Sequence, residues 1–252
     1  EIANKKAEAK KKTEAKKLEI ANKKAEAKKK AEAKKLEKAA GKGFSPAATF
    51  ITHAHADHIC GAGVLGRKTD TTLYMPEAVF ENKQALFKNC KVEYIKEGDD
   101  VTVGDLNVKA FSTRHDSEGS LGYVVTHTPT EKKFGYLTDA GSISKIMKTS
   151  LLGCSAYLLE ADYDETLLEN YEEYDVMLKE RISGPWGHLS NRQILDFIDE
   201  SLELSDIQWI IFGHLSSRTN TPELILKQAS ERFPLFKMKF GVAPTEKSLE
   251  IN

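Results

Sequence analysis

The residues best suited to do chemistry in this sequence are clustered in one short stretch. His53, His55, Asp57 and His58 lie within six residues of one another. Imidazole nitrogens and carboxylate oxygens are ligands that Zn²⁺, Mn²⁺ and Fe prefer. A polar loop that holds histidines by chance is the alternative, but the pattern His-x-His-x-Asp-His is far more specific than a lone pair of histidines. The stretch therefore predicts a metal site.

The elements on either side of this stretch indicate how it is held. Residues 48–52 form a short β-type run, and the small, apolar residues that follow predict a helix over 59–67. The four polar residues would then lie on a loop from a strand to a helix at the edge of a sheet. Proteins of the α/β class commonly place their functional sites there.

Further candidate ligands follow other predicted strands or lie in loops. These are His115, Asp139, His188 and His214, whereas His127 falls in an exposed hairpin. A single histidine in a loop is usually just solvated. The shared placement of these residues at strand and loop ends makes them candidates for the same site.

The rest of the chain after residue 43 alternates between short strands and helices. Strands are predicted at 48–52, 72–75, 91–95, 101–103, 106–111, 121–126, 133–137, 156–159, 209–212 and 236–240. Helices are predicted at 59–67, 76–89, 143–152, 165–182, 190–204 and 221–233. This mixture of hairpins and strand–helix units predicts an α/β fold with two mixed sheets packed face to face and helices outside.

The N-terminal region differs in character from the rest. Residues 1–18 and 19–36 are the same 18-mer except at Thr13 and Ala31. Alanine, glutamate and lysine are strong helix formers, so we expect a long polar helix over residues 1–43 that ends near Gly41. A basic arm for nucleic acid or a membrane surface is one interpretation, and an engineered, artefactual or placeholder segment is the other, which we favour. A second predicted domain covers 44–252.

Composition restricts the classes of partner. The chain of 252 residues has a formal net charge of −1. Residues 1–43 hold 16 lysines and 7 glutamates, which leaves a net charge of −10 on the rest. An acidic body has no broad basic face for nucleic acid.

The three cysteines form no metal or disulfide motif, so reduced thiols and a cytoplasmic location are expected. No apolar run approaches the roughly 20 residues of a membrane span, and the oligomeric state stays open.

These motifs closely resemble those of the metallo-β-lactamase superfamily, and within it the YycJ/WalJ branch of exonuclease-like metallohydrolases. The stretches that carry the resemblance are 52–59, 115–116, 138–141, 187–191 and 213–216. The resemblance covers residues 44–252 and implies an αββα sandwich that holds two divalent metal ions. Zinc is the expected metal, with manganese or iron as alternatives.

The resemblance also implies a role for each polar residue. It implies two ligand sets around the two ions: His53, His55 and His115 on one, and Asp57, His58 and His214 on the other, with Asp139 bridging. Asp57 and His188 are the predicted catalytic residues. The predicted substrate contacts are His188, Ser190, Asn191 and Ser216.

Two metal ions 3.5–4 Å apart can share a hydroxide that attacks phosphorus or a carbonyl carbon. The predicted function is hydrolysis of phosphodiester bonds, by a nuclease of the exonuclease type, with nucleic acid or a small phosphodiester as the substrate. A hydrolase of carboxylic esters, thioesters or lactams is one alternative, because one fold hosts many chemistries. A catalytically impaired, engineered metal-binding scaffold is another.

One region and one single residue depart from the pattern of the family that the sequence resembles. The repeat occupies the region where strands with Gly-Ser-Ser-Gly-Asn-Ser-like and Val-Asp-Ala-Gly-like stretches are expected. Tyr163 stands where a histidine is expected.

Overall fold

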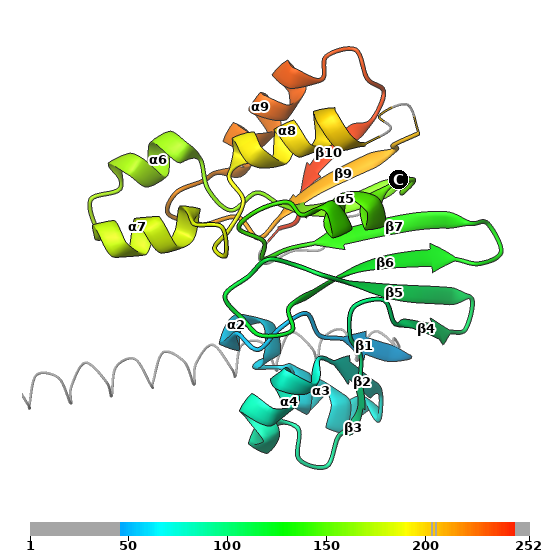
Figure 1. Cartoon of the computed structure of the whole chain (residues 1–252). Coiled ribbons are helices and arrows are strands. Elements are labelled where there is room, and N and C mark those ends of the chain that lie inside the picture. Colours follow the sequence, from blue (N-terminus) through cyan, green and yellow to red (C-terminus); the bar gives the residue numbers. More distant parts are fainter. Residues whose placement is uncertain (1–45, 203, 205, 245–252) are drawn as a thin grey trace, which may run out of the picture.

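The computed structural model describes residues 46–202, 204 and 206–244. The predicted helix over 1–43 lies outside these residues, so it stays a prediction, as does the domain boundary at residue 43. The described residues form two β-sheets that lie face to face, with helices on the two outer faces (Figure 1). This arrangement confirms the predicted α/β sandwich.

The smaller sheet carries the first metal-binding motif. Its three parallel strands are β1 (Ala48–Phe50), β2 (Thr72–Met75) and β3 (Lys91–Tyr94), in that order. The chain leaves β1 through a loop into α2 (Ala56–Ile59) and then α3 (Ala62–Thr69). The helix α4 (Glu77–Lys83) continues as a short 3₁₀ helix, Gln84–Leu86. Buried Leu73, Met75, Val79 and Phe87 pack between this sheet and its helices.

The larger sheet has seven strands, in the order β10-β9-β8-β7-β6-β5-β4. Neighbours from β4 to β7 are antiparallel, and those from β7 to β10 are parallel. The strands are β4 (Asp100–Val103), β5 (Leu106–Ser112), β6 (Leu121–His127), β7 (Lys132–Leu137), β8 (Ala156–Glu160), β9 (Trp209–Gly213) and β10 (Lys239–Val242). The outer helices are α5 (Lys145–Leu151), α8 (Asn191–Ser201) and α9 (Pro222–Arg232).

Aromatic side chains join the inner faces of the two sheets. The Phe50 ring stacks on Tyr74 with centroids 4.9 Å apart and meets the edge of Tyr123 at 5.6 Å. The buried Tyr123 hydroxyl donates a hydrogen bond of 2.6 Å to the carbonyl oxygen of Ile51. This bond satisfies two polar groups that would otherwise be costly to bury. It also fixes the end of β1, from which the metal-binding motif projects.

The helices of the larger sheet begin within two residues of their predicted starts. Ser144, Ser190 and Thr221 cap α5, α8 and α9, each accepting a hydrogen bond from a backbone N–H in the first turn. Such caps satisfy backbone donors that have no partner inside the helix. Among the described residues, no helix is both long and apolar enough to span a membrane.

Several predicted elements differ from the structure in their continuity or in their limits. The single helix predicted over 165–182 is wrong: α6 (Glu165–Asn170) ends, and α7 (Val176–Ser183) begins with Asp175 as its cap. The predicted helix over 59–67 is divided into α2 and α3 at Cys60-Gly61. The helix predicted to reach residue 89 stops as a 3₁₀ turn at Leu86. The last strand covers 239–242, whereas 236–240 was predicted.

The packing of α5 gives a direct test of the fold. Leu151 is fully buried against the larger sheet, whereas Leu235 is 92% exposed. Leu151→Ala should lower the free energy of unfolding by about 2–5 kcal/mol, because it removes buried methyl groups and leaves a cavity. The same truncation at Leu235 should change it by less than about 0.5 kcal/mol. Urea denaturation of both variants checks this, and equal midpoints would contradict the layer arrangement.

Candidate metal centre

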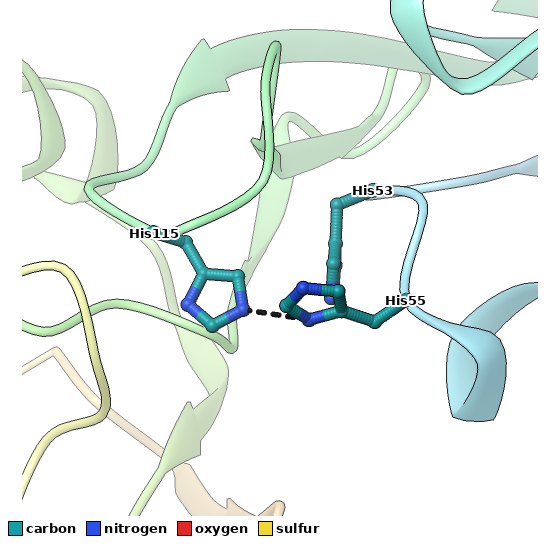
Figure 2. A group of neighbouring side chains, drawn as sticks. All are labelled: His53, His55 and His115. Atoms are coloured by element: carbon teal, nitrogen blue, oxygen red, sulfur yellow. Dashed lines mark hydrogen bonds between the residues drawn. The ribbon is translucent and has the colours of Figure 1, made fainter. Parts of the chain in front are cut away.

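Three histidines from the two sheets meet at one end of the sandwich. His53 and His55 lie on the loop between β1 and α2, and His115 lies on the loop between β5 and β6. Figure 2 shows these three rings facing one another, with His115 Nε2 3.1 Å from His55 Nδ1. The three side chains can each offer one nitrogen to the same ion.

A second group lies beside the first. His58 belongs to α2, and His214 follows directly after β9. Their Nε2 atoms are 3.3 Å apart, and Asp57 Oδ2 is 3.6 Å from His58 Nε2. Asp57, His58 and His214 can also offer one ligand atom each to a shared ion.

Asp139 lies between the two groups, just after β7. Its Oδ1 is 3.8 Å from His53 Nε2, 3.7 Å from His115 Nε2 and 3.3 Å from His214 Nε2. Its Oδ2 is 3.5 Å from His58 Nε2. One carboxylate therefore faces both histidine groups.

Two residues of this cluster adopt a backbone conformation that is unusual outside glycine. Asp139 has φ of +58° and His214 has φ of +56°. Non-glycine residues in this region are uncommon and cost about 1–3 kcal/mol, and they concentrate at functional sites. Here the conformation turns both side chains at their strand ends toward the cluster.

Two of the rings have a hydrogen-bond partner on the side that faces away from the cluster. The carbonyl oxygen of Gly187 accepts a hydrogen bond of 3.0 Å from His115 Nδ1. This bond puts the proton on Nδ1 and leaves Nε2 as a lone-pair donor toward the cluster. Thr52 Oγ1 lies 3.0 Å from His53 Nδ1. Such partners orient metal-binding histidines.

Buried atoms without partners support a cation at this place. His53 Nε2 and Asp139 Oδ2 are buried and have no hydrogen-bond partner among the described residues. Uncompensated buried polar atoms are costly. Two ligand atoms that are each about 2.1 Å from one ion, at tetrahedral angles, lie about 3.4 Å apart. The separations of 3.1–3.8 Å within the cluster match this value, so the residues fit divalent metal ions.

Charges and burial divide the histidines into two kinds. Burial, reinforced by the neighbouring His58, lowers the pKa of His53 to about 2. Burial also lowers the pKa values of His55 and His58. Neutral imidazole is the form that binds metal, so these three are ready as ligands over a wide pH range.

His214 behaves in the opposite way. Burial acts to lower its pKa, but Asp162, Glu160 and Asp139 outweigh burial and raise the pKa to about 12. Glu160 Oε1 is 3.0 Å and Asp162 Oδ2 is 3.6 Å from His214 Nδ1. In the metal-free protein this ring therefore carries a proton on both nitrogens, and a positive charge, at neutral pH.

His188 lies next to the cluster and is held by Glu160. Glu160 Oε1 accepts a hydrogen bond of 2.7 Å from His188 Nδ1. Its other oxygen accepts from the backbone N–H groups of Ala140 (2.9 Å) and Leu189 (3.3 Å). Burial opposes the charged forms, but this pairing raises the pKa of His188 and lowers that of Glu160 to about 2. A fully buried carboxylate thus fixes the His188 ring beside the two ligand groups.

The other predicted substrate contacts have partners within the fold. Ser190 Oγ caps α8 and donates to Glu165 Oε1 at 3.0 Å. Asn191 exchanges two hydrogen bonds with Asn220. Ser216 Oγ accepts from the backbone N–H of Thr219. These bonds give each side chain a structural role, and contact with substrate stays a prediction for all three.

The sequence did not point to every group around the cluster. Asp162 was not selected, although it follows β8 by two residues and so lies at the same sheet edge. The placement of this acidic residue just after a buried strand was a usable signal. The carbonyl of Gly187 could not be found from sequence, because any residue carries one.

The protonated His214 leads to a test by metal titration. A metal ion that binds Nε2 must displace the extra proton, so metal uptake should release protons. Below pH 9, affinity for Zn²⁺ should rise about tenfold per pH unit for each proton released. The number of protons released on binding is measured by calorimetry of Zn²⁺ binding to the metal-free protein, in two buffers of different ionisation enthalpy. His127→Gln, far from the cluster, should release the same number, and pH-independent binding would contradict the assignment.

The chain is similar in sequence to known proteins. The family described as "Beta-lactamase superfamily domain" matches residues 31–202. The chain is 30% identical over 200 residues to the exodeoxyribonuclease YycJ of Bacillus anthracis, covering 76% of this chain and 72% of that protein. It is 34% identical over 182 residues to the exodeoxyribonuclease WalJ of Streptococcus pneumoniae, covering 70% of this chain and 66% of that protein.

A solved structure shows the same fold. The metallo-β-lactamase fold protein YhfI of Bacillus subtilis superposes with a TM-score of 0.58 at 17% identity. The alignment covers 81% of this chain and 79% of that protein.

Proposed function

Since the chain belongs to the β-lactamase superfamily, as the match to residues 31–202 shows, we propose that it is a metal-dependent hydrolase that cleaves phosphodiester bonds in nucleic acid. The observation that carries the proposal is the pair of histidine groups with Asp139 between them. The choice of phosphodiester over carboxylic ester rests on the 30–34% identity to proteins named exodeoxyribonucleases.

The residues in the cluster suit two ions. His53, His55 and His115 would hold one, Asp57, His58 and His214 the other, and Asp139 would contact both. When bound, the ions would supply Lewis acidity and lower the pKa of a water molecule, which is the nucleophile that hydrolysis needs. Zinc suits this set of nitrogen and oxygen donors, and manganese or iron can replace it.

The chain's own groups account for the rest of the reaction. Glu160 holds His188 with its Nδ1–H toward the carboxylate, so its Nε2 is available to a substrate. The raised pKa of His188 favours the protonated ring near neutral pH. A protonated imidazole at this place can give its proton to the leaving oxygen as the ester bond breaks. Asp57, at the exposed side of the cluster, is the second group that we assign to catalysis.

The assay is hydrolysis by purified protein loaded with Zn²⁺ or Mn²⁺. Linear single- and double-stranded DNA, RNA and bis(p-nitrophenyl) phosphate are the substrates, and a thioester and a β-lactam are the comparisons. We expect release of nucleotides from DNA and slow hydrolysis of the aryl phosphodiester. Turnover of the thioester or lactam with phosphodiesters untouched would overturn the proposal in favour of an acyl hydrolase.

A further inference from the structure

A cavity beside the histidine cluster has no role in the proposed reaction. Its volume is about 600 Å³, within the roughly 300–1,000 Å³ typical of small-ligand sites. The start of α4, the segment after β3, the loop between β5 and β6, and Trp186 form its walls. His115 and Asp116 belong to these walls as well as to the surroundings of the cluster. A group attached to a phosphorus atom at the cluster can therefore extend into the cavity.

Trp186 offers this cavity a flat apolar surface. Its side chain is 57% exposed, although tryptophan is a highly buried residue on average. The turn that carries it is fixed: Gly187 N–H donates to Gly184 O (2.9 Å), and Ser142 Oγ donates to Pro185 O (3.0 Å). The same turn provides the carbonyl that orients His115. The backbone that carries the indole is thus fixed relative to the cluster.

The charge of the walls restricts what can bind. Four glutamates and one lysine line the cavity beyond His115 and Asp116: Glu77, Glu81, Glu97, Glu118 and Lys96. A surface with this excess of negative charge repels a phosphate. Carboxylates do accept hydrogen bonds from hydroxyl and amino groups. The cavity therefore suits an uncharged ligand that has an aromatic ring and hydrogen-bond donors.

We propose that this cavity binds the terminal nucleoside of a nucleic acid strand, with its base stacked on Trp186 and its walls excluding a further phosphate. The inference rests on the proposed function and assigns a substrate subsite to it. Only a strand end supplies a nucleoside that carries no phosphate on its far side. Internal nucleotides would place a phosphate against the glutamates, so the subsite would restrict cleavage to strand ends.

The first experiment measures binding without catalysis. The chain has two tryptophans, Trp186 and Trp209. Trp209 lies on β9 beside Lys239 and takes no part in the cavity. Trp209→Phe leaves Trp186 as the single indole, and Trp186→Phe is the matched control. Deoxyadenosine 5′-monophosphate is titrated into each metal-loaded variant, with deoxyribose 5-phosphate as the ligand that has no base.

We expect the nucleotide to quench the emission of the Trp209→Phe variant saturably and to leave that of Trp186→Phe nearly unchanged. Deoxyribose 5-phosphate should quench neither. Equal responses to the two ligands, or no response from Trp186, would overturn the subsite. If DNA is still cleaved in that case, the proposed function survives without it. Absence of all phosphodiester hydrolysis would overturn both.

The second experiment measures the contribution to turnover. The substrates are thymidine p-nitrophenyl phosphate and methyl p-nitrophenyl phosphate, and the readout is the ratio of their kcat/KM values. Trp186→Ala should lower this ratio about 5- to 150-fold, the range expected for loss of one base–aromatic stack. Trp186→Phe should restore most of it, and Trp209→Phe should not change it. A ratio unchanged in Trp186→Ala would contradict the proposal.

The glutamates are tested with strand ends. Oligonucleotides with and without a terminal phosphate, at each end in turn, are compared in the wild type and in the double variant Glu81→Gln, Glu97→Gln. The wild type should degrade the strand without the phosphate faster at the end that it attacks, and the double variant should reduce this preference. Indifference of the wild type to terminal phosphate at both ends would show that the walls do not exclude it.

Discussion

Asp139→Asn is expected to remove most of the hydrolytic activity while leaving the fold intact. The carboxylate lies within 3.3–3.8 Å of ligand nitrogens from both histidine groups. An amide is neutral and cannot offset the charge of two ions. Two-ion chemistry contributes several kcal/mol of transition-state stabilisation, so the rate should fall by roughly three orders of magnitude. Metal content should fall from two ions per chain to one or fewer.

The backbone at this position makes asparagine a suitable replacement. Asp139 has φ of +58°, and asparagine tolerates this region better than most residues. Asp70→Asn is the matched control, because Asp70 has φ of +54° at the end of α3 and lies outside the cluster. It should keep full activity and two ions. An Asp139→Asn variant that retains both would show that Asp139 does not bridge.

Glu160→Gln is expected to lower activity about 10- to 100-fold, the effect typical of residues that orient metal ligands. Glu160 is fully buried and contacts both His188 and His214. The carboxylate raises the pKa of His188, so its loss should lower that pKa. If protonated His188 is the acid, the alkaline limb of the pH–rate profile should move to lower pH in the variant.

A purely structural role for Glu160 would give a different result. Activity would then fall at every pH without a shift of the alkaline limb. Glu231→Gln makes the same chemical change on the surface of α9, where Glu231 pairs only weakly with Lys227 at 3.8 Å. It should change neither the rate nor the profile.

Much of the fold followed from short-range patterns. The strand 72–75 was predicted with its observed limits, and β5, β6 and β8 differ from their predicted ranges by a single residue. These segments are predominantly apolar and are bounded by turn residues, so local sequence decides their structure.

The errors arose where local sequence does not decide. The segment 165–182 is rich in glutamate and predicted one helix, but α6 ends at Asn170 and Asp175 starts a new helix by accepting a hydrogen bond from Leu178 N–H at 2.8 Å. Aspartate is a common helix cap, but the local sequence does not show whether Asp175 starts a new helix or lies inside a continuous one. The last strand moved to 239–242 because its register is set by pairing with β9.

The candidate site was predicted in part. Its residue types and their places at strand ends indicated a metal site, and the structure brings His53, His55, Asp57, His58, His115, Asp139 and His214 together. Not all of the groups that orient them could be predicted from residue type. The hydrogen bond from His115 to the Gly187 carbonyl depends on tertiary geometry, since nothing in a single sequence specifies a contact between residues 115 and 187. The positive φ angles of Asp139 and His214 depend on tertiary geometry in the same way.

The most direct test of the central claim is the metal content of the purified protein, measured by elemental analysis without added metal. The geometry leads us to expect about two transition-metal ions per chain, and about one or fewer in Asp139→Asn. Near-zero content with no uptake of added Zn²⁺ or Mn²⁺ would contradict the account. The histidine cluster would then not be a working metal centre, and the proposal that this chain hydrolyses phosphodiesters would have to be abandoned.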